Sequence, residues 1–292
     1  MEVTLRNTSA VAVIDTKGAE LKSFQDGFGT EYMWQADPKY WGRTSPVLFP
    51  IVGNLRNNRT IIQNKEYEIP KHGLLRDAEF RLLYHSDEKA IFSYIATEET
   101  KAHYPFDFQL QMTYSLDGCD LEVKYDVFNL GKTEMPFCLG AHPAFNIPVT
   151  TEDTFDQYYI RFDKEMTTAT PVYDLEQLHW INDKRITRLE NTDSMKLDYD
   201  LFEEAIFFDE FEPSTVTISS QLTGRGVKVD MVGFPTVAFW TPANKQAPFL
   251  CVEPWCGSAV YDTEDDEFLH KRDVQILSPD EKKSFCMTIH ML

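Results

Sequence analysis

Basic residues are scarce in this sequence, and it has no stretch that looks like a membrane span or an export signal. The 292 residues include 28 Lys and Arg against 47 Asp and Glu, a formal net charge of −19. Such an acidic surface repels phosphate backbones and anionic lipids, which argues against nucleic acid or a membrane as a partner. No run approaches about 20 apolar residues, and the N-terminus has no basic segment followed by an apolar one. We therefore expect a soluble, cytoplasmic protein.

Cysteine is also rare, and its count is odd. The chain is too large to need disulfide bonds for its stability, and with five cysteines this favours reduced thiols in a cytosol. Cys251 and Cys256 are five positions apart, and no second cysteine pair or histidine pair follows at ligand spacing. We expect buried or half-buried thiols and no metal site.

Helical periodicity is nearly absent, and the dominant period is two. Residues 108–116 alternate apolar with polar side chains, Asp117-Gly118 forms a turn, and residues 119–127 alternate again, which predicts a β-hairpin. Short helices are expected only around residues 174–178 and 200–204, so a parallel sheet built from βαβ units is not supported. Further strands are expected at residues 4–14, 66–69, 80–84, 90–96, 215–219, 227–232, 237–240 and 284–289.

No linker, repeat or low-complexity segment divides the chain. All-β sandwiches and barrels often reach this length as one unit, so we predict an all-β fold of mostly antiparallel strands in a single domain, residues 1–292.

Four segments depart from the strand pattern by combining Pro, Gly, aromatic and titratable residues. In residues 140–146, Pro143 favours an extended backbone at His142. In residues 251–257, Glu253 follows an apolar run and precedes Pro-Trp, which places a carboxylate at the end of a buried strand. A structural histidine and an ion-paired glutamate are the alternative interpretations of these two residues.

The other two segments, residues 43–56 and 72–77, carry basic side chains. Arg43 and Arg56 flank a Pro-rich stretch, and His72 lies four positions before Arg76 in a loop-like segment. Basic groups in an acidic chain suggest a site for sugar hydroxyls or a phosphate. Surface ion pairs and fixing of a loop are the alternatives.

The four segments, in this order and spacing, resemble the aldose 1-epimerase (galactose mutarotase-like) family, in particular its LacX-like branch, found with bacterial sugar operons. Residues 18–23, 31–34 and Tyr40-Trp41 resemble the family's N-terminal part, and the likeness runs from about residue 11 to residue 290. The resemblance implies a β-supersandwich with an open cleft on one sheet face. It also implies an enzyme that interconverts the α and β anomers of a sugar.

The resemblance also implies roles for single residues. Glu253 matches the catalytic base and His142 the catalytic histidine, while His72 matches a second histidine that holds the ring oxygen or a hydroxyl. Arg76 is expected to add a contact. Trp255 is a candidate for an apolar face against the sugar ring, with core packing as the alternative; the same alternatives apply to Phe145.

Two departures from the family pattern affect substrate binding. The branch usually reads Gly-Arg where this chain has Gly53-Asn54, so the binding arginine is either Arg56 or absent. The acidic residue that clamps the substrate falls near residues 202–206, where Glu204 is the closest candidate; Asp209 and Asp230 are weaker alternatives.

Mutarotation suits a carboxylate and a histidine. The C1 hydroxyl must lose a proton while the ring oxygen gains one, so a base and an acid must face different atoms of one sugar. Proton transfer by positioned groups contributes about 10²- to 10⁴-fold, and the reaction needs no metal, nucleotide or other cofactor.

Other functions stay open at this point. A hexose-phosphate mutarotase is the alternative enzyme, with Arg43, Arg56 and Arg76 holding the phosphate. A carbohydrate-binding or sugar-sensing protein that has lost the chemistry is the alternative outside enzymes, because fold does not determine function. A hydrolase that acts through two carboxylates is a third possibility, although no partner for Glu253 stands out. The sequence is compatible with a monomer or a homodimer.

Overall fold

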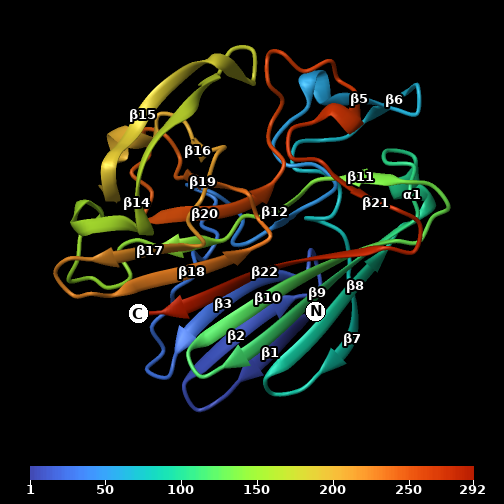
Figure 1. The fold of residues 1–292 in the computed structure, drawn as a ribbon. Helices are drawn as coiled ribbons and strands as arrows, with labels where there is room; N and C mark the ends of the chain where they lie inside the picture. Colours follow the sequence, from blue (N-terminus) through green and yellow to red (C-terminus); the bar gives the residue numbers. More distant parts are fainter.

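The computed structural model describes residues 1–292 and consists mainly of antiparallel β-strands (Figure 1). Its one α-helix, α1 (Glu98–Lys101), has four residues. No helix has the length and apolar character that crossing a bilayer would require. The all-β prediction is therefore confirmed. Four short 3-10 helices complete the helical content: η1 (Arg56–Asn58), η2 (Phe155–Gln157), η3 (Tyr199–Phe202) and η4 (Phe268–His270).

The largest sheet has nine strands in the order β15-β14-β17-β18-β22-β10-β9-β8-β7. The predicted hairpin around Asp117-Gly118 joins β9 to β10. Every second residue of β10, such as Leu121, Val123 and Tyr125, points into the core. The strand bounds are β7 (Arg81–His85), β8 (Lys89–Ile95), β9 (Phe108–Asp117), β10 (Asp120–Asn129), β14 (Tyr158–Asp174), β15 (His179–Lys196), β17 (Thr215–Ser220), β18 (Gly226–Val232) and β22 (Lys282–Met291).

A second sheet carries the candidate site. It runs in the order β16-β19-β20-β12-β4, with β13 also paired to β20. One of its faces joins a core cluster of 63 buried residues that also includes the inward side chains of the nine-stranded sheet. Figure 1 shows the second sheet above the larger one. Its strands are β4 (Val47–Leu48), β12 (Leu139–Ala141), β13 (Ala144–Asn146), β16 (Ile206–Phe208), β19 (Thr236–Trp240) and β20 (Phe249–Cys256).

Three smaller sheets complete the fold. The predicted strand at residues 4–14 is wrong as a single element, because β1 ends at Arg6 and β2 starts at Ala10. Between them, the side chain of Asn7 accepts hydrogen bonds from the N–H groups of Ser9 and Ala10 and closes a turn. The smaller sheets contain β1 (Glu2–Arg6), β2 (Ala10–Asp15) and β3 (Glu20–Asp26); β5 (Arg59–Ile62) and β6 (Lys65–Glu68); and β11 (Met135–Phe137) and β21 (Gln275–Leu277).

The helix predicted around residues 174–178 is also wrong. This segment is the turn between β14 and β15, where Asp174 Oδ1 accepts hydrogen bonds of 2.9 Å from the N–H groups of Glu176 and Gln177. An aspartate that bonds the next backbone N–H groups has the same local signature at a turn and at a helix start. The second predicted helix, at residues 200–204, is the single 3-10 turn η3.

Candidate active site

The strand β20 presents different chemistry on its two faces. Leu250 and Val252 enter the 63-residue core, whereas Cys251, Glu253 and Trp255 share the opposite face because side chains alternate along a strand. Glu253 and Trp255 line a cavity of about 470 Å³, a size suited to a small ligand. The outer face of the second sheet is therefore the floor of this cavity.

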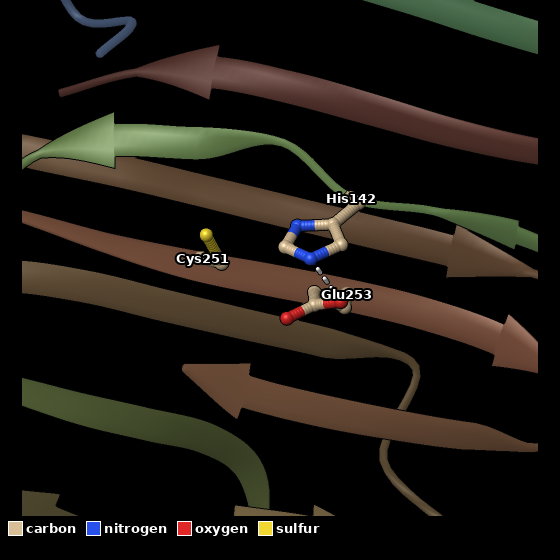
Figure 2. Close-up of side chains that lie close together, drawn as sticks. All are labelled: His142, Cys251 and Glu253. Carbon is tan, nitrogen blue, oxygen red and sulfur yellow. Dashed lines mark ion pairs between the residues drawn. The ribbon is translucent and has the colours of Figure 1, made fainter. Parts of the chain in front are cut away.

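Glu253 meets His142 in this cavity. His142 follows β12, and its Nε2 lies 3.0 Å from Oε2 of Glu253 (Figure 2). The two side chains come close without hydrogen-bond alignment, and neither His142 Nδ1 nor Glu253 Oε2 has a hydrogen-bond partner within the protein. His142 is 7% exposed and Glu253 is 2% exposed. Buried polar groups normally make hydrogen bonds, which these two atoms lack. A ligand that exchanges protons with both groups would supply the missing partners.

Aromatic rings hold the His142 imidazole in place. Trp41 stacks on it with ring centroids 4.8 Å apart, and Trp240 packs edge-on at 5.9 Å. His72 approaches edge-on from another side at 5.6 Å. The ring therefore keeps its orientation toward Glu253 through packing on three sides.

His72 is a neutral hydrogen-bond donor. Its Nδ1 accepts a hydrogen bond of 3.2 Å from the Gly53 N–H, which leaves the ring proton on Nε2. Burial lowers the pKa of His72 well below its usual value, and the nearby charge of His142 lowers it further. His72 lines the cavity beside His142. His72 is therefore better suited to donate a hydrogen bond to a ligand oxygen than to transfer a proton in a reaction.

Lys71 and Arg76 line the same cavity and have no ion-pair or hydrogen-bond partner for their side-chain nitrogens. Burial lowers the pKa of the Arg76 guanidinium, which is half-buried. Although Lys71 keeps an exposed surface, the cavity walls also lower the pKa of its ammonium. The sequence analysis singled out Arg76 and missed Lys71.

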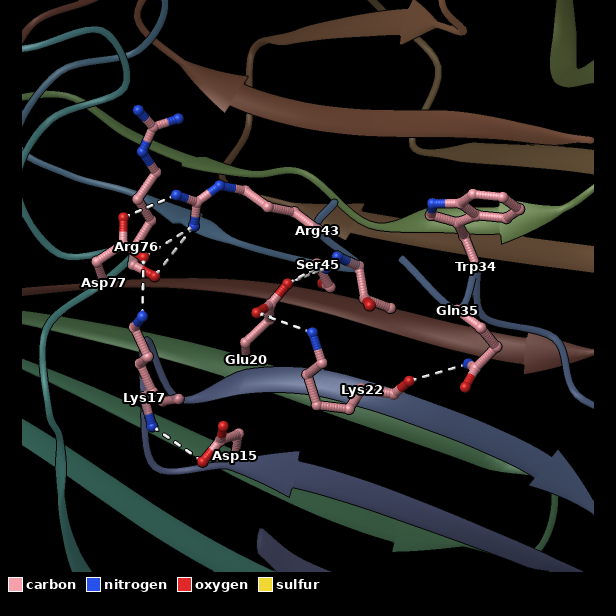
Figure 3. Close-up of polar contacts among 12 residues, drawn as sticks. Asp15, Lys17, Glu20, Lys22, Trp34, Gln35, Arg43, Ser45, Arg76 and Asp77 are labelled. Carbon is pink, nitrogen blue, oxygen red and sulfur yellow. Dashed lines mark hydrogen bonds and ion pairs between the residues drawn. The ribbon is translucent and has the colours of Figure 1, made fainter. Parts of the chain in front are cut away.

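Arg43 and Arg56 do not line the cavity. Arg43 Nη2 lies 2.7 Å from Asp77 Oδ2, in the polar network of Figure 3. Arg56 Nε lies 3.1 Å from Asp266 Oδ1, and its Nη2 donates to the carbonyl oxygens of Tyr261 and Glu264. Both guanidinium groups therefore hold loops together, the alternative that the sequence left open.

Among the acidic candidates, Glu204 lines the cavity. Its carboxylate accepts a hydrogen bond of 3.0 Å from the Tyr173 N–H, and burial raises its pKa. Asp209 is buried outside the cavity, where it binds Arg185 and Arg272, and Asp230 binds His290 and Thr215 on the nine-stranded sheet. Phe145 belongs to the main core.

The tip of the β14–β15 hairpin supplies cavity residues that the sequence analysis missed. Tyr173 and Trp180 line the cavity, and the Tyr173 hydroxyl donates to Asn54 Oδ1 at 2.8 Å. Asn54 in turn donates to the Leu178 carbonyl at 2.6 Å, so the tip is tied to the loop after Gly53. The sequence analysis noted Asn54 only as a departure from the family pattern, which does not indicate this contact.

Two buried indole groups are also without partners. Neither Trp180 Nε1 nor Trp255 Nε1 has an acceptor within the protein, although both tryptophans line the cavity. An indole N–H can only donate. The cavity therefore suits a ligand rich in oxygen acceptors.

One group of donor atoms in the site has a composition that zinc accepts. A ring nitrogen of His142, the sulfur of Cys251 and a carboxylate oxygen of Glu253 lie within 4.8 Å of one another (Figure 2). Burial, followed by the charge of Glu253, raises the pKa of Cys251 well above its usual value. Without a metal, the Cys251 thiol is therefore held in its neutral form.

The sequence is similar to known proteins along nearly its whole length. The family model described as "Aldose 1-epimerase" matches residues 1–290. The plasmid protein LacX of Lactococcus lactis subsp. lactis is 35% identical over 299 residues, which cover 99% of each chain.

Two solved structures extend the comparison to the fold. A galactose mutarotase related enzyme from Lactobacillus acidophilus superimposes with a TM-score of 0.93 at 30% identity, covering 100% of this chain and 97% of the other. A galactose mutarotase-like protein from Lactobacillus casei ATCC 334 gives a TM-score of 0.88 at 27% identity, covering both chains fully. The predicted galactose mutarotase-like fold is confirmed.

Proposed function

Because the chain belongs to the aldose 1-epimerase family, we propose that it is an isomerase that interconverts the α and β anomers of an aldohexose. The observation that carries this proposal is the 3.0 Å approach of His142 Nε2 to Glu253 Oε2 in a cavity of about 470 Å³. A base and an acid that act on one sugar must be neighbours, because the anomeric oxygen and the ring oxygen are both bonded to C1.

Glu253 acts first as the base. Its carboxylate takes the proton of the C1 hydroxyl, while His142 in its protonated form donates a proton to the ring oxygen. The bond between C1 and the ring oxygen breaks, and the open-chain aldehyde rotates about the bond between C1 and C2. On closure His142 takes the proton back and Glu253 returns the other, so both residues end in their starting states.

The remaining cavity residues hold the sugar. His72 is placed to donate its Nε2 proton to a sugar oxygen, and Glu204 is placed to accept from a hydroxyl. Trp41 and Trp255 offer apolar ring surface to the C–H faces of the pyranose. Arg76 adds a cationic contact.

The test is a measurement of ring equilibration. Freshly dissolved α-D-glucose or α-D-galactose is followed by polarimetry with and without the protein. We expect equilibration faster than the uncatalysed reaction and proportional to protein concentration. If the sugar binds without faster equilibration, the protein is a carbohydrate-binding or sensing protein instead.

A further inference from the structure

Two cations in the cavity make no ion pair, although the protein is strongly acidic. Arg43 and Arg56 are paired with Asp77 and Asp266, whereas the nitrogens of Lys71 and Arg76 have no carboxylate within ion-pair distance. Figure 3 shows the contrast, because Arg43 reaches Asp77 while the guanidinium of Arg76 extends away from that network. None of the 47 acidic residues forms an ion pair with either cation, although Glu253 acts on Lys71 and Asp77 acts on Arg76 at longer range.

This arrangement costs free energy in the unliganded protein. Burial lowers the pKa of both groups, and a neighbouring positive charge lowers each further: Arg76 acts on Lys71, and Arg43 acts on Arg76. Glu253 offsets part of the repulsion at Lys71 through its negative charge. The catalytic carboxylate and the two cations therefore share one electrostatic environment.

We infer that the aldose bound in this cavity carries an anionic group, a phosphate ester or a carboxylate, which Lys71 and Arg76 bind. The inference rests on the proposed function and names its substrate class. Lysine and arginine side chains only donate hydrogen bonds, and the oxygens of such an anion only accept them. The anion provides the charge that the protein itself does not place there.

The loop that carries both cations also carries His72. Lys71 and His72 are adjacent, and Arg76 lies one short turn further along the chain. The positive charges of Lys71 and Arg76 both act on His72, whose ring lies 5.6 Å from the ring of His142. An anionic substituent can therefore reach the cations while C1 of the same sugar faces the His142–Glu253 pair.

The charge of the whole protein makes such a pair necessary for an anionic substrate. With a net charge of −19, the surface repels anions in general. The cavity lining itself adds the carboxylates Glu203, Glu204 and Glu253, so an anionic substrate depends on direct contact with Lys71 and Arg76. A neutral aldose would need no such compensation.

The experiment compares sugars that differ only at C6. Exchange between anomers is measured by NMR for D-glucose and D-galactose, for their 6-phosphates, and for D-glucuronate and D-galacturonate. We expect kcat/KM to be about tenfold or more higher for one anionic class than for the neutral sugar of the same configuration. Preference for the phosphates or for the uronates identifies which anion the site takes.

Variants that remove the charge of Lys71 or Arg76 test whether these residues cause the preference for anionic sugars. Lys71→Gln and Arg76→Gln are each expected to reduce the ratio of anionic to neutral kcat/KM severalfold, and the double variant to bring it near one. Arg43→Gln removes a nearby positive charge that does not line the cavity, so it serves as the matched control and should keep the wild-type ratio.

The possible failures are distinguishable. If all the sugars are accelerated and kcat/KM is independent of charge at C6, the inference is overturned and the proposed function stands. An anionic preference that survives in the double variant also overturns the assignment to these two residues. If no sugar is accelerated, the proposed function fails, and the inference fails with it.

Discussion

At the scale of single residues, the site combines groups that are buried and yet free to react. Glu253 and His142 approach to 3.0 Å, while one polar atom on each side chain lacks a hydrogen bond. Leaving buried polar atoms unpaired costs about 1–3 kcal/mol each, a cost that purely structural residues seldom carry. The arrangement is therefore typical of residues kept for binding or chemistry.

Removing either proton-transfer group should abolish most of the activity. We expect Glu253→Gln and His142→Asn each to lower the mutarotation rate by about 10²-fold or more, because each variant keeps a similar shape and loses the proton transfer. Polarimetry measures the rate, and circular dichroism checks the fold. Glu66→Gln, the same change in an exposed ion pair on β6, should keep the wild-type rate. Near-full activity in either site variant would contradict the mechanism.

His72 predicts a pH dependence of stability. The folded protein lowers its pKa, so below about pH 6.5 the unfolded chain binds a proton that the folded state resists. The free energy of unfolding should therefore fall as pH decreases, by up to about 1.4 kcal/mol per pH unit from this residue. Stability is unaffected by this group above its unfolded pKa.

Urea unfolding at a series of pH values between about 8 and 5 measures this dependence. His72→Asn should flatten the acid side of the profile, and asparagine also tolerates the positive φ of 66° at this position. His85→Asn changes an exposed histidine and should retain the wild-type profile. An unchanged slope in His72→Asn would show that other groups cause the acid destabilisation.

At the scale of elements, the loop at residues 70–77 depends on one glycine. Gly73 has φ of 82°, and a Cβ added there would lie 2.1 Å from the carbonyl oxygen of Phe49. The N–H of the next residue, Leu74, donates to that same oxygen at 2.7 Å. The close backbone approach holds the loop against the second sheet and places His72 in the cavity.

Gly73→Ala is therefore expected to destabilise the protein by about 3 kcal/mol or more, through the left-handed backbone and the clash together. Gly29 is the matched control, because its φ is 83° and a Cβ there meets nothing within 4 Å. Gly29→Ala should cost only about 1 kcal/mol, the conformational part alone. Similar losses of unfolding free energy in the two variants would show that the contact with Phe49 is unimportant.

At the scale of the whole molecule, strands from distant parts of the chain are interleaved. The C-terminal strand β22 lies between β18 and β10, near the middle of the nine-stranded sheet. One core cluster of 63 residues includes side chains of both large sheets. Neither sheet can lose its structure without exposing the core of the other, so we propose that residues 1–292 form one cooperative domain.

Unfolding in urea tests this proposal with two probes. All five tryptophans belong to clusters on the outer face of the second sheet or pack against them. Because only Trp180 lies on a strand of the nine-stranded sheet, their fluorescence reports mainly on the surroundings of the second sheet. Far-UV circular dichroism reports on all the strands. We expect coincident transitions by the two measurements. Separate midpoints would show that the sheets unfold independently.

The comparison between sequence and structure depends on which interactions are local. Alternation predicted the β9–β10 hairpin because side-chain direction in a strand reverses at each residue. An apolar run predicted a buried strand that ends at Glu253, and the structure confirms the buried strand but extends it to Cys256. Local patterns failed at residues 174–178, where an aspartate-capped turn has the local signature of a helix start.

The sequence by itself determined the strand-rich character of the protein, its acidic charge and, through the family resemblance, the residues with reactive side chains. Only the tertiary structure decided which of these residues meet. Arg43, Arg56 and Arg76 carry the same group, yet Asp77 and Asp266 engage the first two while Arg76 faces the cavity. Strand pairing between distant segments determines such neighbours, and no local pattern records it because the contacts join residues far apart in the chain.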